Sequence, residues 1–228
     1  MKTYPVQIVS LGSGAPDNIT LKAFRVLEEV DVIVAPGSAA LLALSSLENA
    51  ENIMEKTVLK NCPMTRDREE TLALYRNIAD EISDLVIQGK KVALVTIGDA
   101  SIYSTAQYVC DELNVPYIVL PGVPSFVSAA AMANSSLVRQ GDNLTILSEI
   151  ANATDIEMPL SRGEVVVVMK LSVHQELVRE VIKRGQYSFV YAEKMGNPDE
   201  EWFTEDYAEL SGRKCPYLSL IIIKPKRI

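Results

Sequence analysis

The chain has 228 residues, of which 48% are hydrophobic and 23% charged, and its formal net charge is −8. Apolar runs recur along the whole length, which is typical of a folded protein rather than a disordered one. Nucleic-acid binding usually needs a basic surface that releases counterions, so the acidic balance argues against it.

Cysteine and histidine usage also excludes several classes of protein. Three cysteines without a CxxC pair and a single histidine, His174, argue against a zinc site, and free thiols suit a reducing compartment. No apolar run approaches the roughly 18 residues of a membrane-spanning helix. The stretch "MKTYPVQIVSLGSG" suits a first strand better than a signal peptide. We therefore expect a soluble cytoplasmic protein with no nucleic-acid or membrane partner.

Strands and helices alternate along the first half of the chain. Buried apolar runs predict strands, and apolar residues at helical spacing predict helices. The expected elements are a strand over 6–12, a helix over 15–30, a strand over 31–37, a short helix over 39–46, a strand running into a loop over 57–65, a long helix over 66–89, a strand over 91–98 and a helix over 105–114. Asp17 or Asn18 is the candidate N-cap of the first helix.

The second half shows the same alternation. A strand ends at Pro121-Gly122, and a helix of small residues starts near Ser125. Further strands are expected over 144–148, 164–170, 188–193 and 217–224, with a helix over 174–185. The alternation predicts an α/β fold with mostly parallel sheets, in which the last strand is a candidate for antiparallel pairing. The rigid turn marks a boundary, so we expect two α/β domains, 1–119 and 120–228.

Ligands in open α/β sheets bind beyond the carboxyl ends of the strands. Three loops leave such ends: "GSGAPD" at 12–17, "IGDASIYST" at 97–105 and "PGVPSF" at 121–126. A fourth candidate is Met169-Lys170, although a methionine there also suits the core. The first loop is half of a dinucleotide fingerprint. However, Asp17 stands where the third glycine is needed, and Asp31 lies at the wrong end of the second strand, which argues against NAD.

The second loop carries the most chemistry. Gly98 allows close approach to the backbone, and Asp99 is a carboxylate at the mouth of a buried strand. Asp99 either caps the following helix or holds, with nearby backbone groups, a polar or cationic ligand. Phosphate is a poor candidate because the loop has an acid and no P-loop lysine. His174 has no visible second member of a catalytic dyad, and no triad can be assembled.

Taken together, these loops resemble the signatures of the tetrapyrrole methylase family, the S-adenosylmethionine-dependent precorrin and uroporphyrinogen methyltransferases. The stretches are "VSLGSGAPDNITLKAFRVLEEVDVIVAP", "VTIGDASIYST" and "LPGVPSFVSAAA". The resemblance covers essentially the whole chain. Within the family, "CPMTRD", Tyr103, "GVPSFVSAAA" and "PYLSLIIIK" are most similar to the C20-methyltransferases of cobalamin (vitamin B12) biosynthesis.

The resemblance implies two α/β lobes with the cofactor, S-adenosyl-L-methionine, in the cleft between them, and usually a homodimer. It places the cofactor contacts on Ile97, Gly98, Asp99, Ile102, Pro124, Ser125, Met169, Ala192 and Met195. The chain departs from the usual family motifs at four positions: Ser13 replaces a proline, Ala15 an aspartate, Ala100 a proline and Pro124 a threonine. Contacts made by backbone groups survive such changes, whereas Pro124 has no N–H to donate.

The implied reaction is methyl transfer to C20 of precorrin-2 or cobalt-factor II, which leaves S-adenosyl-L-homocysteine. The substrate carries the nucleophile, so the catalytic residue and the proton acceptor stay unassigned. A substrate with many carboxylates needs nearby cations; the candidate substrate-binding residues are Tyr103, Arg66, Arg68, Arg139 and Lys170. Whether the substrate holds cobalt stays open. The alternatives are a methylase acting at another ring position or on uroporphyrinogen III, and a non-catalytic nucleotide-binding module.

Overall fold

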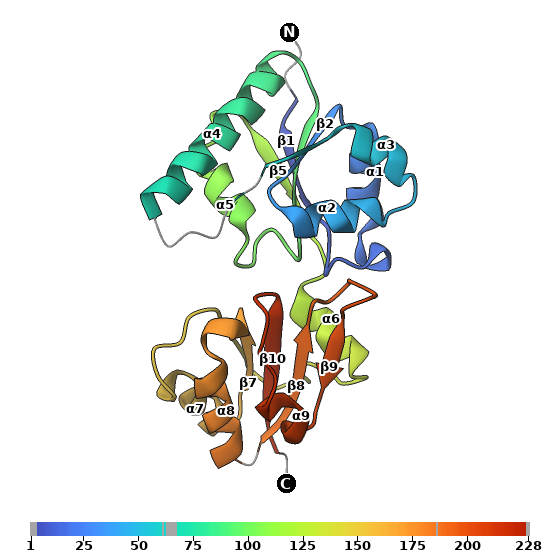
Figure 1. Cartoon of the computed structure of the whole chain (residues 1–228). Coiled ribbons are helices and arrows are strands. Elements are labelled where there is room, and N and C mark those ends of the chain that lie inside the picture. The colour runs from blue at the N-terminus through green and yellow to red at the C-terminus, as the bar shows by residue number, and fades with distance from the viewer. Residues whose placement is uncertain (1–3, 61, 63–67, 186, 227–228) are drawn as a thin grey trace. The chain divides into compact units, whose positions relative to one another are not determined.

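The computed structural model describes residues 4–60, 62, 68–185 and 187–226. The chain divides into two compact units, Met1–Pro124 and Ser125–Ile228 (Figure 1). Each unit is built on its own five-stranded sheet. Within the described ranges, none of the helices combines the length and apolar character that a membrane crossing requires.

The first unit is a fully parallel α/β sheet. Its elements are β1 (Val6–Ser10), η1 (Pro16–Asn18), α1 (Leu21–Glu29), β2 (Val32–Ala35), α2 (Ser38–Ser45), α3 (Ala50–Glu55), β3 (Thr57–Leu59), α4 (Arg68–Ile87), β4 (Val92–Thr96), α5 (Thr105–Cys110) and β5 (Tyr117–Leu120). The strand order is β3-β2-β4-β1-β5, and every pairing is parallel. The predicted alternation of strands and helices is therefore confirmed in this unit.

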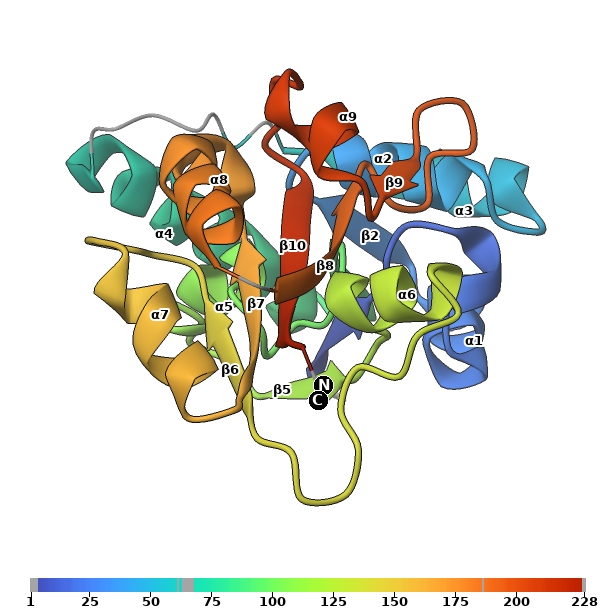
Figure 2. The same cartoon turned by 90° about the horizontal axis from the view of Figure 1, so that it is seen from below.

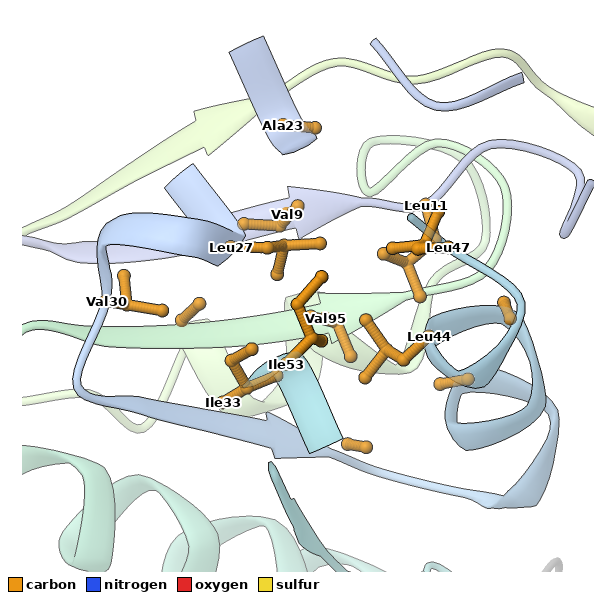
Figure 3. Packing of buried hydrophobic residues seen from close by; sticks show 14 of the residues in the cluster. Val9, Leu11, Ala23, Leu27, Val30, Ile33, Leu44, Leu47, Ile53 and Val95 are labelled. Atoms are coloured by element: carbon orange, nitrogen blue, oxygen red, sulfur yellow. The ribbon is translucent and has the colours of Figure 1, made fainter. Parts of the chain in front are cut away.

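Helices cover both faces of this sheet because its strands are apolar on both sides. Val9 and Val95 point to the face covered by α1, α2 and α3, where Leu27 packs against them (Figure 3). Ile8 and Leu94, their neighbours along the same strands, belong to the cluster beneath α4 and α5. Successive strand residues point to opposite faces, so a continuous apolar run is what a doubly covered strand requires.

The first helix begins later than the sequence predicts. It starts after Thr20, whose hydroxyl accepts a 3.2 Å hydrogen bond from the Ala23 N–H. Asp17 and Asn18 belong instead to η1, a separate 3-10 turn, and the backbone at Ile19 is extended. Neither predicted residue is therefore the N-cap of α1.

The second unit contains α6 (Ser125–Met132), β6 (Leu144–Leu147), α7 (Thr154–Ser161), β7 (Val165–Met169), η2 (Leu171–Val173), α8 (Gln175–Arg184), β8 (Tyr187–Glu193), β9 (Trp202–Thr204), α9 (Tyr207–Ser211) and β10 (Ser219–Pro225). Its strand order is β6-β7-β10-β8-β9. Strand β10 lies between β7 and β8 and runs antiparallel to both, as expected for the last strand. In this sheet the parallel pairing joins β6 and β7, and β9 runs antiparallel to β8.

The second sheet is also covered on both faces (Figure 2). Helix α6 packs against β8 and β10 on one face. On the other face, α7, α8 and α9 enclose a cluster that includes Val166, Val168 and Ile221. The α/β class predicted from the sequence is confirmed in both units. The expectation of mostly parallel strands holds for the first sheet but is wrong for the second, where three of the four pairings are antiparallel because the last strand inserts between β7 and β8.

Candidate functional site

The carboxyl ends of β4, β1 and β5 lie side by side, because these strands are neighbours in a parallel sheet. The three loops singled out in the sequence follow these ends. The first two loops are joined through their backbones, since the Gly98 N–H donates to the Gly12 carbonyl oxygen at 2.5 Å. The φ angles of Gly12 and Gly98 are 70° and 79°, a conformation that glycine adopts without steric cost. The two loops therefore form one continuous edge.

Asp99 fastens the second loop to the third. Its side chain is buried, and its Oδ2 accepts a hydrogen bond from the Gly122 N–H at 2.8 Å. Its Oδ1 accepts from the Ser101 N–H at 2.8 Å and from the Ser101 hydroxyl. Helix α5 is capped instead by Ser104, whose Oγ accepts from the Ala106 N–H at 3.1 Å. Both carboxylate oxygens of Asp99 thus face donors of the protein itself.

These donors also control the ionisation of Asp99. Burial by itself would raise the pKa of the carboxyl group, because the charged form loses hydration. The hydrogen bonds from the Ser101 hydroxyl and from the backbone N–H groups of Gly122 and Ser101 outweigh burial, and the pKa of Asp99 lies below its usual range. The carboxylate is therefore charged near neutral pH, the state that holds the loops together.

The third loop approaches the other two so closely that position 122 has no room for a side chain. A Cβ atom on Gly122 would stand 2.5 Å from the Ser10 Cβ, 2.8 Å from the Gly98 carbonyl oxygen and 3.2 Å from the Gly12 nitrogen. The Ser10 hydroxyl accepts a hydrogen bond from the Ala100 N–H at 2.8 Å. Ser10 was not predicted from the sequence, although a serine that ends an apolar strand is a visible signal.

The backbone of Gly98 is open beside the joined loops. No described atom lies within 4 Å of the position that a Cβ on Gly98 would occupy. Ile97 is partly buried against the core beneath α1, and the N–H of half-buried Ile102 donates to the Asp99 carbonyl at 3.1 Å. Tyr103 is 45% exposed. An open glycine backbone flanked by two isoleucines and a tyrosine suits a ligand with both polar and apolar parts.

The departures from the family motifs have structural consequences. Ser13 is buried, and its hydroxyl accepts a 2.8 Å hydrogen bond from the Asn18 side chain, which braces the first loop. Ala15 is the N-cap of η1, and its side chain makes no capping hydrogen bond. Pro124 is half-buried and directly precedes Ser125, the first residue of α6.

A second group of predicted cofactor residues lies at the carboxyl ends of β7 and β8. Met169 and Ala192 both pair with Leu220 of β10, so the structure brings them together across three adjacent strands. Met195 follows β8 in a turn that begins at Lys194, whose N–H donates to the segment just before β10 at 2.8 Å. Ala192 is fully buried, whereas Met169 and Met195 are half-buried. The two methionines therefore reach the surface of this edge.

The expected substrate cations are distributed over the chain. Arg66 lies outside the described residues, as does the side chain of Arg68, the residue at which α4 begins. Arg139 is exposed in the connection between α6 and β6. Lys170 follows β7 with a φ of 54°, and its Nζ lies 6.0 Å from the centroid of the Tyr217 ring. Of the two cations whose side chains are described, Arg139 and Lys170, it is Lys170 that lies at the same sheet edge as Met169.

An ion pair between a buried carboxylate and a partly exposed guanidinium supports this edge. The carboxylate of Glu193, the last residue of β8, accepts hydrogen bonds from the Arg213 guanidinium at 2.9 and 2.5 Å and another from the Tyr191 hydroxyl. The Arg213 guanidinium lies 3.9 Å from the centroid of the Trp202 ring. Burial would raise the pKa of Glu193, but the bonds from Arg213 and Tyr191 outweigh it and lower the pKa below its usual range. This ion pair was not predicted from the sequence.

The single histidine lies near the same end of the second sheet. His174 precedes α8, and its Nε2 is buried without a hydrogen-bond partner among the described residues, 3.9 Å from Glu149 Oε2. The described part of the chain contains no cluster of three or more His, Cys, Asp or Glu side chains that could hold a metal. The described residues therefore form no hydrogen-bonded dyad with the Nε2 of His174.

Three loops fastened at the carboxyl edge of a parallel sheet, with an open glycine among them, are typical of ligand-binding proteins of the α/β class. The family model described as "Tetrapyrrole (Corrin/Porphyrin) Methylases" matches residues 5–211. The chain belongs to this family.

Individual relatives agree with the family. The chain is 29% identical over 226 residues to the cobalt-precorrin-2 C(20)-methyltransferase of Salmonella typhimurium, with 94% of each chain covered. It is 28% identical to the probable cobalt-precorrin-2 C(20)-methyltransferase of Methanocaldococcus jannaschii, covering 95% of this chain and 94% of that one. Among solved structures, a cobalt precorrin-4 methyltransferase has the same fold, with a TM-score of 0.71 at 20% identity over 96% of this chain and 94% of that one.

Proposed function

We propose that the protein is an S-adenosyl-L-methionine-dependent methyltransferase that methylates C20 of precorrin-2 or its cobalt-containing counterpart in cobalamin biosynthesis. The observation that carries this proposal is the match over nearly the whole length to two C20-methyltransferases. The relatives that act at C11 match at 28–29% identity but over only 70–79% of the chain, which favours C20 over that position.

The cofactor assignment rests on the two sheet edges. A uroporphyrin-III C-methyltransferase from Thermus thermophilus with the same fold was solved with the demethylated cofactor, at a TM-score of 0.62. We assign the loop from Ile97 to Ile102 in the first unit to cofactor binding, together with the step from Pro124 to Ser125, at which the chain passes into the second unit. In the second unit we assign Met169, Ala192 and Met195. The open space beside Gly98 fits such a ligand because its backbone can be approached directly.

The residues present match the chemical demands of methyl transfer. When bound, the cofactor supplies an activated methyl group on a sulfonium, and the substrate carbon supplies the electron pair. The protein therefore has to align the two and exclude water. The hydrogen bonds of Asp99 to Gly122 and Ser101 give the first edge a fixed shape, so the role we assign to Asp99 is positioning of the loops.

Turnover with a defined tetrapyrrole tests the proposal. The full chain is incubated with methyl-¹³C-labelled cofactor and, in parallel, with anaerobic precorrin-2 and with cobalt-factor II. We expect a mass gain of one methyl group and a ¹³C signal located at C20 by NMR. A label at another ring position would show a different methylase of the family. Binding of S-adenosyl-L-homocysteine with no methyl transfer to any tetrapyrrole would favour the non-catalytic module.

Two finer points belong to the same proposal. We infer that the enzyme acts as a homodimer, as the family resemblance implies, and that it works in the cytoplasm, which its free thiols favour. Light scattering coupled to gel filtration should then give twice the chain mass of 25.1 kDa. A monomer mass across micromolar concentrations would contradict the dimer without affecting the activity assignment.

A further inference from the structure

Three large apolar side chains are exposed at the edge of the second sheet that carries the predicted cofactor residues. Tyr217 is 39% exposed, Leu218 46% and Val173 72%. Tyr217 and Leu218 directly precede β10, whose first residues pair with the carboxyl ends of β7 and β8. Val173 belongs to η2, which packs against β10. Clustered exposed apolar side chains at one edge commonly mark a binding surface.

The backbone holds this group in place. The Leu218 carbonyl accepts a 2.8 Å hydrogen bond from the Lys194 N–H, and the Tyr217 carbonyl accepts one at 2.9 Å from the Ser219 N–H. Two residues earlier, the Cys215 N–H donates to the Gln175 side chain at 2.9 Å. The exposed ring is therefore presented by an anchored segment, which lowers the entropic cost of binding to it.

Lys170 gives the same surface a positive charge. Its Nζ lies 6.0 Å from the centroid of the Tyr217 ring. Its backbone has a φ of 54°, a left-handed conformation that costs a non-glycine residue free energy and is often found at ligand sites. None of the carboxylates in the described ranges forms a salt bridge with Lys170. The surface thus combines a flat aromatic ring, aliphatic side chains and an ammonium group.

We propose that Tyr217, Leu218 and Lys170 form a platform for the tetrapyrrole substrate, with the macrocycle stacked on the Tyr217 ring and a peripheral carboxylate paired with Lys170. A tetrapyrrole is flat, apolar over its face and anionic around its rim, which matches this arrangement of side chains. The platform rests on the proposed function and names the residues that would recognise its substrate. Tyr217 and Leu218 would be new substrate-binding residues, beside the Lys170 expected from the sequence.

Binding measurements on the full chain test the platform. The probe is uroporphyrin III, a planar porphyrin with carboxylates around its rim, titrated by fluorescence against wild type, Tyr217→Ala, Tyr217→Phe and Lys170→Gln. A matched control is Tyr117→Ala, which removes a tyrosine that is 44% exposed on β5 of the first unit. Thermal melting followed by circular dichroism checks that each variant is folded.

We expect Tyr217→Ala to weaken porphyrin binding about 5- to 150-fold, the range for loss of one stacked aromatic ring. Tyr217→Phe keeps the ring and should stay within about 3-fold of wild type, since stacking needs no hydroxyl. Lys170→Gln should weaken binding and flatten its dependence on salt, because a charge pair is screened by ions. Tyr117→Ala should bind as wild type does, and the affinity for S-adenosyl-L-homocysteine should be unchanged in all four variants.

Several results would overturn the platform. Wild-type porphyrin affinity in a folded Tyr217→Ala variant that still methylates its substrate would reject the platform and leave the proposed function intact. An equal loss of affinity for S-adenosyl-L-homocysteine would assign the ring to the cofactor instead. Dissociation of a dimer by Tyr217→Ala would assign it to a second copy of the chain. A wild type that neither binds nor methylates any tetrapyrrole would reject the platform and the proposed function together.

Discussion

Asp99→Asn should destabilise the first unit by breaking the link between its loops. The carboxylate of Asp99 accepts hydrogen bonds from Gly122 and Ser101 on its two oxygens. An asparagine keeps one acceptor oxygen, and its NH₂ group must then face a donor. A hydrogen bond to a charged group contributes about 1.5–3 kcal/mol, and a buried donor left unpaired costs about 1–3 kcal/mol. We therefore expect the free energy of unfolding to fall by about 2–4 kcal/mol at pH 7.

The pH dependence gives the prediction its sharpest test. The pKa of Asp99 is lowered in the folded protein, below an unfolded value of about 3.9. The stabilisation is thus fully present above that unfolded value and is lost as the pH falls through the folded pKa. The difference between wild type and Asp99→Asn should be full at pH 7 and should shrink below about pH 4.

Urea unfolding followed by circular dichroism at several pH values measures both quantities. Asp80→Asn, a substitution at an exposed position on α4, is the matched control and should change the free energy of unfolding by less than about 0.5 kcal/mol. If Asp99→Asn is as stable as wild type at pH 7, or if its deficit does not change at low pH, then the carboxylate does not hold the loops together. Calorimetry with S-adenosyl-L-homocysteine at pH 7 then shows whether loosening the loops also weakens the binding of this ligand.

Three further predictions follow from close contacts and burial. Gly122→Ala should destabilise the protein by about 1–3 kcal/mol in urea and weaken S-adenosyl-L-homocysteine binding, whereas Gly212→Ala, where no described atom lies within 4 Å of the new Cβ and φ is −95°, should do neither. Arg213→Ala leaves the buried Glu193 carboxylate without its partner; because the Arg213 side chain is 37% exposed and water screens the pair, we expect a loss of about 2–3 kcal/mol in urea unfolding rather than more. Burial, and then the carboxylate of Asp111, raise the pKa of the Cys110 thiol to about 11. At pH 8 a thiol reagent should therefore label Cys110 about 100-fold more slowly in the native protein than in urea. Equal labelling rates would show that the thiol is accessible and ionised in the native protein.

The sequence predicted the buried strands of the fold and missed several of its other elements. Continuous apolar runs such as 92–96 and 165–169 are buried on both faces, and periodicity is enough to identify them. Strand β9 has three residues, and its existence depends on pairing with β8, which no local pattern encodes. Helix α7 was missed because Pro159 stands inside it, and proline usually argues against a helix interior.

The candidate site shows the same limit. Gly98 and Asp99 could be predicted as site residues because they follow directly after a buried strand. The hydrogen-bond partners of Asp99, in contrast, depend on the strand order β4-β1-β5. Gly122 lies 23 residues from Asp99 in the chain and donates to its carboxylate. Such partners become predictable only once the order of the strands is known.

Strand order also explains why the departures from the family motifs are compatible with this edge. At position 100 the family usually has a proline, which has no N–H to donate. Here the Ala100 N–H donates to the Ser10 hydroxyl at 2.8 Å, so the departure adds a hydrogen bond between the ends of β1 and β4. Ser13, also in place of a proline, accepts from the Asn18 side chain. In both cases a rigid ring is replaced by a hydrogen bond, so the loops are held by pairing rather than by restricted backbone angles. The three loops of this chain are therefore held in place by polar contacts of Ser10, Ser13 and Asp99.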